Sequence, residues 1–248
     1  MLGWSVKTIP LQEDNQLIER YEQKEISPIW SDKNKLRLWL DSELSSVWAK
    51  ERLGTTPSGV LERMESILLA TPIDIAWWKA KDDEIHHDLQ AFVEERLRWL
   101  PVELQQYFHE LMTSFDTEDP AFARMLLESM KAVFVFTQPF LEALKDKALL
   151  YRYTPMNGRT HGQEAELQTF GKRCLTWFKE FSVANSQLCL VSANLVYSKM
   201  SGAIGNYGSV NPEVERLALE RLGLNPFYGA TQIIPRILYA PEADALCE

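Results

Sequence analysis

The chain has 248 residues, a formal net charge of −9 and 46% hydrophobic residues, the composition of a folded globular protein with a sizeable core. It has no dense run of lysine and arginine, so nucleic-acid binding is not expected. We find no signal-peptide pattern in "MLGWSVKTIPLQEDNQ" and no apolar run long enough to span a membrane. The three cysteines, Cys174, Cys189 and Cys247, are odd in number and form no C-x-x-C motif. We therefore predict reduced thiols in a cytoplasmic protein.

Nearly every periodic segment has the apolar spacing of a helix, so the sequence predicts an all-α fold. The first predicted helix begins at a cap formed by Ser31 and Asp32 and ends at Gly54. The shorter helices that we expect are 31–54, 58–70, 82–100, 102–112 and 211–223. We predict a small N-terminal helical domain over 1–112 and an incomplete central bundle of long helices over 113–248.

Two longer helices are predicted over 120–149, with a kink at Pro139, and over 163–198. In the second, apolar residues recur at alternating intervals of four and three, which defines a heptad seam about 50 Å long. The seam consists of Phe170, Cys174, Trp177, Phe181, Ala184, Leu188, Val191 and Leu195. Such a seam needs equally long partner helices, from other copies of the chain or from a monomeric core. The Gly-rich segment 200–212 is predicted to be a loop.

The segment "GRTHGQ" at 158–163 gathers hydrogen-bonding side chains in front of the second long helix. Thr160 and Gln163 have the spacing of a capping box, so we expect Thr160 to cap this helix. His161 would then lie in the first turn, where free backbone N–H groups attract an anion. The segment is therefore either an anion site with a histidine for proton transfer, or a cap beside one exposed histidine.

Three further groups contain side chains suited to chemistry. His87 and Asp88 place a histidine beside a carboxylate, Thr113 and Ser114 carry hydroxyls, and Arg20-Tyr21 pairs a cation with an aromatic ring that suits a nucleotide. Each group also has a plain structural interpretation: a solvated helix face, helix caps and a surface pair. No histidine or cysteine spacing typical of metal ligands is present.

Taken in chain order, these groups resemble adenylosuccinate lyase, a family of the fumarase/aspartase superfamily. The matching segments are Arg20-Tyr21, Ile29-Trp30-Ser31 with "WLDSE" (39–43), His87-Asp88 with Ala91-Phe92, Thr113-Ser114-Phe115-Asp116, "GRTHGQ" with "TFGK" (169–172), "SGAIG" (201–205), and Thr231-Gln232 with Arg236. One such motif is weak evidence, but this many in the same order are specific. The resemblance covers about residues 18–236.

The resemblance implies β-elimination of fumarate from adenylosuccinate, giving AMP, and from the related succinylated imidazole-carboxamide ribotide of purine synthesis. His161 and His87 would serve proton transfer and leaving-group stabilisation. The substrate-binding residues that it implies are Arg20, Tyr21, Asp88, Thr113, Ser114, Thr160, Gln163, Gln232 and Arg236. The family assembles its sites in a homotetramer, with a purine nucleotide as substrate and neither metal nor organic cofactor.

The chain also departs from the family pattern. Ile85 replaces a threonine, Phe115 a serine, and Glu164 a proline. The family's later loop, whose serine acts as the base, has no counterpart in 237–248. We therefore expect either the N-terminal part of a lyase, truncated or completed by a C-terminal chain, or a non-catalytic paralogue that binds purine nucleotide or a lyase subunit. A carboxymuconate cycloisomerase, which shares "GRTHGQ", is a further alternative.

Overall fold

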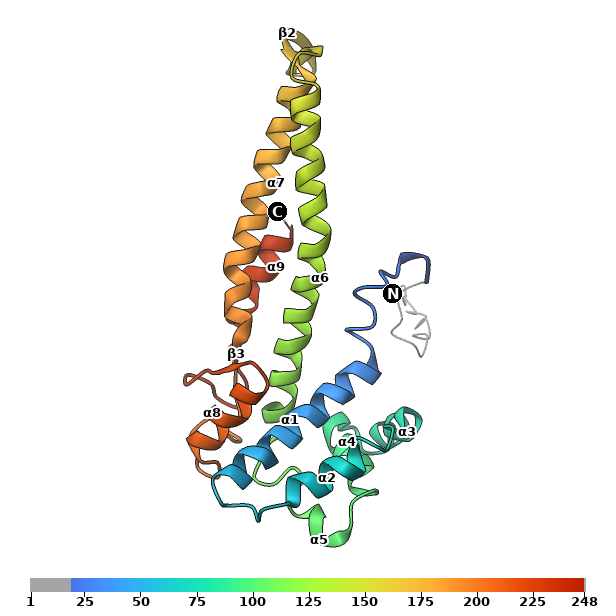
Figure 1. Ribbon diagram of the computed structural model, residues 1–248, viewed down its shortest axis with the longest axis vertical. Helices are drawn as coiled ribbons and strands as arrows, with labels where there is room; N and C mark the ends of the chain where they lie inside the picture. The colour runs from blue at the N-terminus through green and yellow to red at the C-terminus, as the bar shows by residue number, and fades with distance from the viewer. Residues whose placement is uncertain (1–18, 248) are drawn as a thin grey trace, which may run out of the picture.

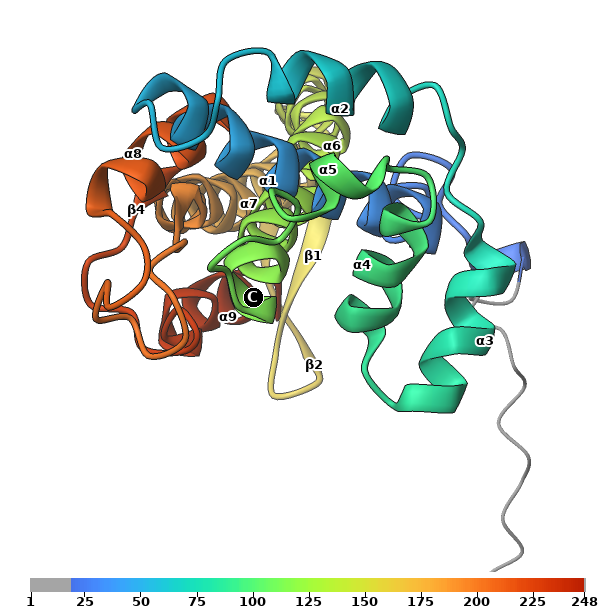
Figure 2. The ribbon, with the colours of Figure 1, turned by 90° about the horizontal axis from the view of Figure 1, so that it is seen from below.

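The computed structural model describes residues 19–247 and confirms a mostly helical fold. Two long antiparallel helices form an arm that rises from a base of shorter helices, and a β-hairpin lies at the tip of the arm (Figure 1). Viewed along the arm, α8 and α3 lie on opposite sides of the base (Figure 2). No helix within 19–247 has both the length and the apolar character needed to cross a membrane.

The base begins with α1, whose ends follow the predicted signals. The side chain of Ser31 accepts a hydrogen bond from the backbone N–H of Asn34, and Gly54 follows the helix with φ of 73°. The helical elements of the base before the arm are η1 (Glu19–Tyr21), α1 (Asp32–Arg52), α2 (Val60–Leu68), α3 (Ile75–Ile85), α4 (Asp88–Leu97) and α5 (Val102–Gln105). Their shared core contains Leu36, Trp39, Met64, Phe92 and Phe108, and extends to Ala121 and Met125 of the arm.

The single helix predicted over 82–100 is wrong, because the chain breaks at the two histidines. His86 adopts the left-handed conformation, with φ of 54°, and ends α3. His87 has an extended backbone and is the N-cap of α4. The predicted helix over 102–112 is also too long: α5 has four residues, and the positive φ of His109 and Leu111 is incompatible with a continuing helix.

The first helix of the arm, α6 (Ser114–Leu150), starts six residues before its predicted beginning. The N–H of Thr113, at the N-cap, donates to Asp116 Oδ2 over 3.0 Å, and the residues between this cap and the start predicted at 120 belong to the helix. Pro139 lies inside α6, which continues through it. Phe140 of α6 contacts Phe181 of the second arm helix edge to face, with ring centroids 4.8 Å apart.

The prediction that Thr160 caps the second long helix is wrong. Residues Pro155–Thr160 and Gln163–Thr169 form an antiparallel hairpin, β1 and β2, in which Thr160 pairs with Gln163. His161 and Gly162 form its two-residue turn, with φ of 53° and 75°. Two successive positive φ values are the requirement of a type I′ turn, so the histidine-glycine pair makes a hairpin where a helix start was expected.

The second arm helix, α7 (Phe170–Ser192), is capped by Thr169 and continues as η2 (Ala193–Val196). The predicted seam correctly identifies the side of α7 that faces α6: Cys174, Leu188 and Leu195 are buried, although Trp177 is exposed. The partner helix therefore comes from the same chain. Other apolar side chains of the arm remain uncovered, including Val135, Leu150, Val183 and Leu190.

The remaining elements return the chain to the base. They are β3 (Tyr197–Ser198), α8 (Pro212–Arg221), β4 (Asn225–Pro226), η3 (Arg236–Leu238) and α9 (Ala240–Cys247). The predicted loop and the helix that ends at Gly223, with φ of 75°, are confirmed. A core of Ala49, Ala123, Met200, Val214 and Leu219 joins α1, α6 and α8. The boundary expected at residue 112 remains a prediction.

Candidate active site

The break between α3 and α4 fixes the ring of His87. Its Nδ1 accepts the backbone N–H of Gln90 over 3.2 Å, as the N-cap of α4. In the neutral ring the proton must then sit on Nε2, which lies 3.4 Å from Ser114 Oγ. The local turn thus determines which ring nitrogen is available to a ligand, and it aims that nitrogen at the start of α6.

Residues from three segments surround this pair in a cavity of about 520 Å³, called here the histidine cavity. Its lining consists of Asp82, His86, His87, Asp88, Ser114, Phe115, Glu118 and Gln232. The structure therefore brings together four of the predicted site residues: His87, Asp88, Ser114 and Gln232. These four residues are separated by up to 145 positions along the chain, from 87 to 232.

A second cavity, of about 540 Å³, adjoins the first and is called here the tryptophan cavity. Asp88, Phe115 and Glu118 line both. The second cavity adds Trp30, Trp39, Lys35, Phe122, Arg236 and Tyr239. Its mixture of rings and charges suits a ligand with both flat and ionic parts.

Arg236, a predicted substrate residue, is anchored at the edge of the tryptophan cavity. It donates from Nη1 to Asp119 Oδ1 over 2.7 Å, and its guanidinium lies 5.6 Å from the centre of the Phe115 ring. Asp119 also accepts the backbone N–H of Ile234 over 2.8 Å. Despite these donors, burial raises the pKa of Asp119 above its usual range. The partly exposed guanidinium keeps further donors for an anionic ligand.

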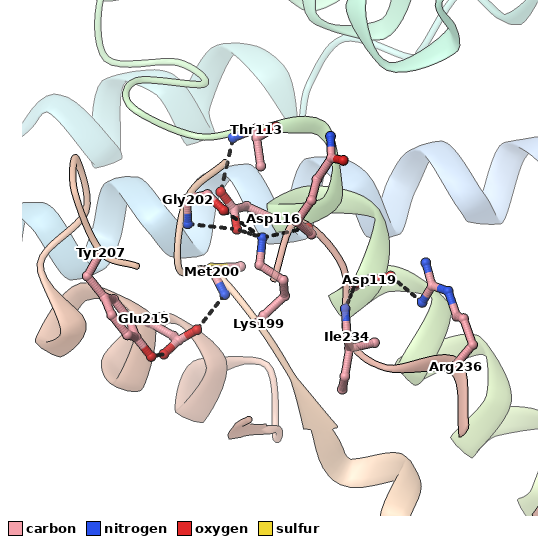
Figure 3. Close-up of polar contacts among 11 residues, drawn as sticks. Thr113, Asp116, Asp119, Lys199, Met200, Gly202, Tyr207, Glu215, Ile234 and Arg236 are labelled. Carbon is pink, nitrogen blue, oxygen red and sulfur yellow. Dashed lines mark hydrogen bonds and ion pairs between the residues drawn. The ribbon is translucent and has the colours of Figure 1, made fainter. Parts of the chain in front are cut away.

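A buried network of an ion pair and hydrogen bonds connects the start of α6 with the segments around Lys199 and Gln232 (Figure 3). Lys199 Nζ donates to Asp116 Oδ1 over 2.6 Å and to the carbonyls of Gly202 and Gln232, each over 3.0 Å. Lys199 and Asp116 are both completely buried. Because Lys199 holds the backbone of Gln232, the network positions that side chain at the cavity. The motif search found Asp116 but missed Lys199, since no local pattern identifies a partner 83 residues away.

Glu215 extends the network to α8. Its carboxylate accepts the N–H of Met200 over 2.8 Å and the hydroxyl of Tyr207 over 2.6 Å. Burial raises the pKa of Glu215, so the two hydrogen bonds offset only part of the desolvation of its carboxylate. These contacts fix the start and the middle of the Gly-rich loop against α8.

Glu118 was also missed by the sequence interpretation, although it lines both cavities. Burial, with the nearby negative charges of Asp88 and Asp119, raises the pKa of Glu118 from 4.5 to about 7. A carboxyl group that is half protonated at neutral pH is unusual. Together with its place in the lining of both cavities, this pKa makes Glu118 a candidate functional residue.

The other predicted site residues lie elsewhere. Arg20 and Tyr21 are exposed in η1, where the guanidinium lies 6.0 Å from the centre of the tyrosine ring, and neither lines a cavity described above. Thr113 caps α6 beside Ser114. Thr160, His161 and Gln163 are exposed at the tip of the arm. Since α6 has 37 residues, about 55 Å of helix separates the tip from the histidine cavity of the same chain.

Within residues 19–247, no group of three or more histidine, cysteine, aspartate or glutamate side chains is placed to hold a metal ion. The chemistry that the described geometry can supply is therefore a histidine with a defined tautomer, a hydroxyl donor, an amide and a guanidinium around one concave surface.

A family model described as lyase matches residues 24–245. The chain belongs to this lyase family. Within the family it is 37% identical over 224 residues to adenylosuccinate lyase of Thermotoga maritima and 35% identical to that of Aquifex aeolicus. These alignments cover 90% of the chain and 51% of each relative, so the chain spans about half the length of the curated relatives it matches. The resemblance recognised from the motifs is confirmed.

Solved structures agree on the fold of this lyase-family chain. A fumarate lyase from Mesorhizobium sp. BNC1 has a TM-score of 0.83 at 22% identity, covering 89% of this chain and 52% of that one. A β-carboxy-cis,cis-muconate cycloisomerase from Acinetobacter calcoaceticus sp. ADP1 has a TM-score of 0.82 at 21% identity, covering 90% and 54%. At such low identity the likeness establishes the fold alone.

Proposed function

We propose that the chain takes part in adenylosuccinate-lyase-type β-elimination, releasing fumarate from adenylosuccinate and from the succinylated imidazole-carboxamide ribotide in cytoplasmic purine synthesis. The observation that carries this proposal is the convergence of His87, Asp88, Ser114 and Gln232 on one cavity. Each belongs to a motif shared with the adenylosuccinate lyases. The identity of 37% to the Thermotoga maritima enzyme supports the same assignment.

The elimination needs a proton removed beside a carboxylate, donors for the resulting dianion, and a proton for the departing nitrogen. We assign the carboxylates of the substrate to Thr113, Ser114 and Gln232, and its phosphate to Arg20 or Arg236. His87, with its proton on Nε2, is suited to protonate or stabilise the leaving group. The roles of His87, Ser114, Gln232 and Arg236 are assigned from the lining of the two cavities. The roles of Thr113 and Arg20 are assigned from the family motifs alone, and no cofactor is required.

The second histidine, His161, cannot reach the same cavity within one chain, because the length of α6 separates them. We therefore propose that His161, Thr160 and Gln163 serve the site of another copy, in a homo-oligomer such as a tetramer. The uncovered apolar side chains of the arm support this assembly, since patches of that kind mark interaction surfaces. The exposed turn is suited to insertion into a neighbouring site.

The direct test is an ultraviolet assay of adenylosuccinate cleavage by the purified chain. The proposal expects turnover, either by the chain alone or after addition of the C-terminal half of the Thermotoga maritima enzyme. The fragment is included because the chain spans about half of that relative. Absence of turnover in both settings would contradict the lyase proposal.

A second candidate is a non-catalytic paralogue that binds purine nucleotide or a lyase subunit. Two observations favour it: Phe115 replaces a hydroxyl at the histidine cavity, and Glu118 adds a carboxyl there. Calorimetry separates the candidates. AMP binding without turnover in either setting would favour the paralogue, whereas turnover that disappears in His87→Ala would exclude it.

A further inference from the structure

The wall between the histidine and tryptophan cavities contains a titratable group that the proposed reaction has not used. Asp88, Phe115 and Glu118 line both cavities, so a ligand that occupies either cavity meets the same wall. Glu118 is half-buried on α6. It lies four residues after Ser114, and residues at this spacing project from the same face of a helix. Its carboxyl therefore borders the space beside the Ser114 hydroxyl.

The charges around Glu118 make this an unusual position for an anion site. Negative groups face it from α1, from the α3–α4 corner and from α6 itself; they are Asp32, Asp82, Asp88 and Asp119. The facing cations are Lys35 of α1 and Arg236 of η3, and His86, His87 and Tyr239 add titratable groups. With more carboxylates than cations, the wall repels an anionic ligand whenever Glu118 is ionised.

We propose that Glu118 determines ligand specificity by carrying a proton when a carboxylate-bearing ligand occupies the joined cavities. In that state it donates a hydrogen bond to the ligand carboxylate, and binding is coupled to proton uptake. The inference rests on the proposed function for the class of ligand, a dicarboxylate such as the succinyl group.

Two properties of Glu118 support the coupling. Neutral carboxylic acids donate strong hydrogen bonds to carboxylates, whereas two ionised carboxylates at the same distance repel each other. The pKa of Glu118, raised to about 7 by burial and by Asp88 and Asp119, leaves the group about half protonated in the empty cavity at neutral pH. An anion beside Glu118 raises that pKa further, so binding completes the protonation.

The coupling predicts how affinity changes with pH. If only protonated Glu118 accepts the ligand, affinity follows its protonated fraction, which falls about tenfold between pH 6 and pH 8 for a pKa near 7. At pH 7, binding takes up about half a proton from solution. Both quantities are accessible by calorimetry, the second by comparing buffers with different ionisation enthalpies.

The experiment titrates succinate into the whole chain at pH 6, 7 and 8, for wild type, Glu118→Gln and Asp82→Asn. Glutamine keeps a hydrogen-bond donor without titrating, so we expect Glu118→Gln to bind with affinity nearly independent of pH and without the half-proton uptake. Asp82→Asn removes the same charge from the lining of the histidine cavity. It should retain the tenfold dependence.

If the succinate affinity of wild type and of Glu118→Gln changed equally with pH, the inference would be overturned, and the proton taken up on binding would be assigned to the histidines. Failure of succinate to bind the wild type at every pH would also overturn it. Adenylosuccinate cleavage is measured on the same samples. Cleavage with unaltered pH dependence in Glu118→Gln contradicts the inference alone. The predicted succinate profile contradicts the lyase proposal alone if cleavage is absent both with and without the C-terminal half of the Thermotoga maritima enzyme.

Discussion

The base and the arm of this molecule differ in how completely they bury their side chains. The base buries its own polar and apolar groups. A continuous core joins α1 to α5 with the start of α6, and both the Asp116–Lys199 ion pair and the hydrogen bond from Met200 to Glu215 are enclosed within one chain. The arm pairs only α6 with α7 over much of its length. There, the side chain of Val135 is 68% exposed and that of Leu190 is 75% exposed.

Under the proposed assembly, this difference corresponds to a division of roles: the base acts within one chain, and the arm packs against another copy. The base needs no partner to place His87, Ser114 and Gln232 around a cavity. A two-helix arm with exposed apolar side chains is stabilised when other helices cover it, and its tip contains His161. If the base is self-sufficient and the arm is not, substitutions in the two regions should differ in their effects on unfolding and on assembly.

The largest effect should come from breaking the buried ion pair in the base. Lys199→Met leaves Asp116 buried without its cation, and we expect a loss of about 3 to 5 kcal/mol in the free energy of unfolding, measured by urea denaturation. Arg216→Met is the control: Arg216 pairs with Glu213 and Glu220 on the exposed face of α8, and its loss should leave the free energy of unfolding nearly unchanged. Equal losses would contradict the role given to the network.

A charge on the arm should weaken assembly without unfolding the base. We expect Val135→Lys to raise the dissociation constant of the oligomer by about tenfold or more in sedimentation, because a lysine would be buried at the interface. Val102→Lys is the matched control: Val102 is 81% exposed, but in the base. Equal weakening by both variants, or a monomeric wild type, would show that the arm is not the interface.

The end of the chain contains a buried carboxyl that should destabilise its own helix. Within the described residues, neither oxygen of Glu242 has a hydrogen-bond partner, and burial raises its pKa above 4.5. We expect Glu242→Leu to increase the free energy of unfolding by about 1 to 3 kcal/mol at pH 8, whereas the exposed Asp244→Leu should be neutral.

The effect of Glu242 should depend on pH with a definite sign. Folding retains a proton on Glu242 above its unfolded pKa, so wild-type stability falls as pH rises from about 4.5 through the raised folded value. The gain from Glu242→Leu should therefore be smaller at pH 4 than at pH 8. A larger gain at pH 4 would contradict the raised pKa.

The smallest structural effect should come from the tip of the arm. His161 is exposed in a turn with φ of 53°, where its imidazole contributes little packing. We expect His161→Ala to change the free energy of unfolding by less than about 1 kcal/mol, because alanine loses no contact but tolerates positive φ less well. A drop of several degrees in melting temperature would mean that the imidazole is a packing residue.

Local patterns predicted much of this molecule. The helix over 31–54, the buried face of α7 and the helix closed by Gly223 follow from caps, heptad spacing and glycine, all of which act within a few residues. The errors arose where local patterns are ambiguous. The segment "THGQ" is compatible both with a capping box and with a two-residue hairpin turn. The structure has the hairpin, in which His161 adopts a positive φ.

The candidate site was partly predictable for the same reason. His87, Ser114 and Gln232 belong to contiguous motifs, whereas their meeting in one cavity depends on Lys199 and its contacts across the fold. Glu118 escaped notice because nothing in "DTED" distinguishes an exposed carboxyl from one between two cavities. Burial and neighbouring charge, which determine its pKa, are properties of the tertiary structure.

The central claim is that one site uses His87 of one copy and His161 of another. The most direct test mixes His87→Ala with His161→Ala, allows subunits to exchange, and measures adenylosuccinate cleavage under the conditions in which the wild type turns over. Each variant alone should lose about 100-fold or more, and the mixture should recover activity, because some sites receive both intact histidines. A mixture as inactive as its components, beside an active wild type, would contradict the shared site.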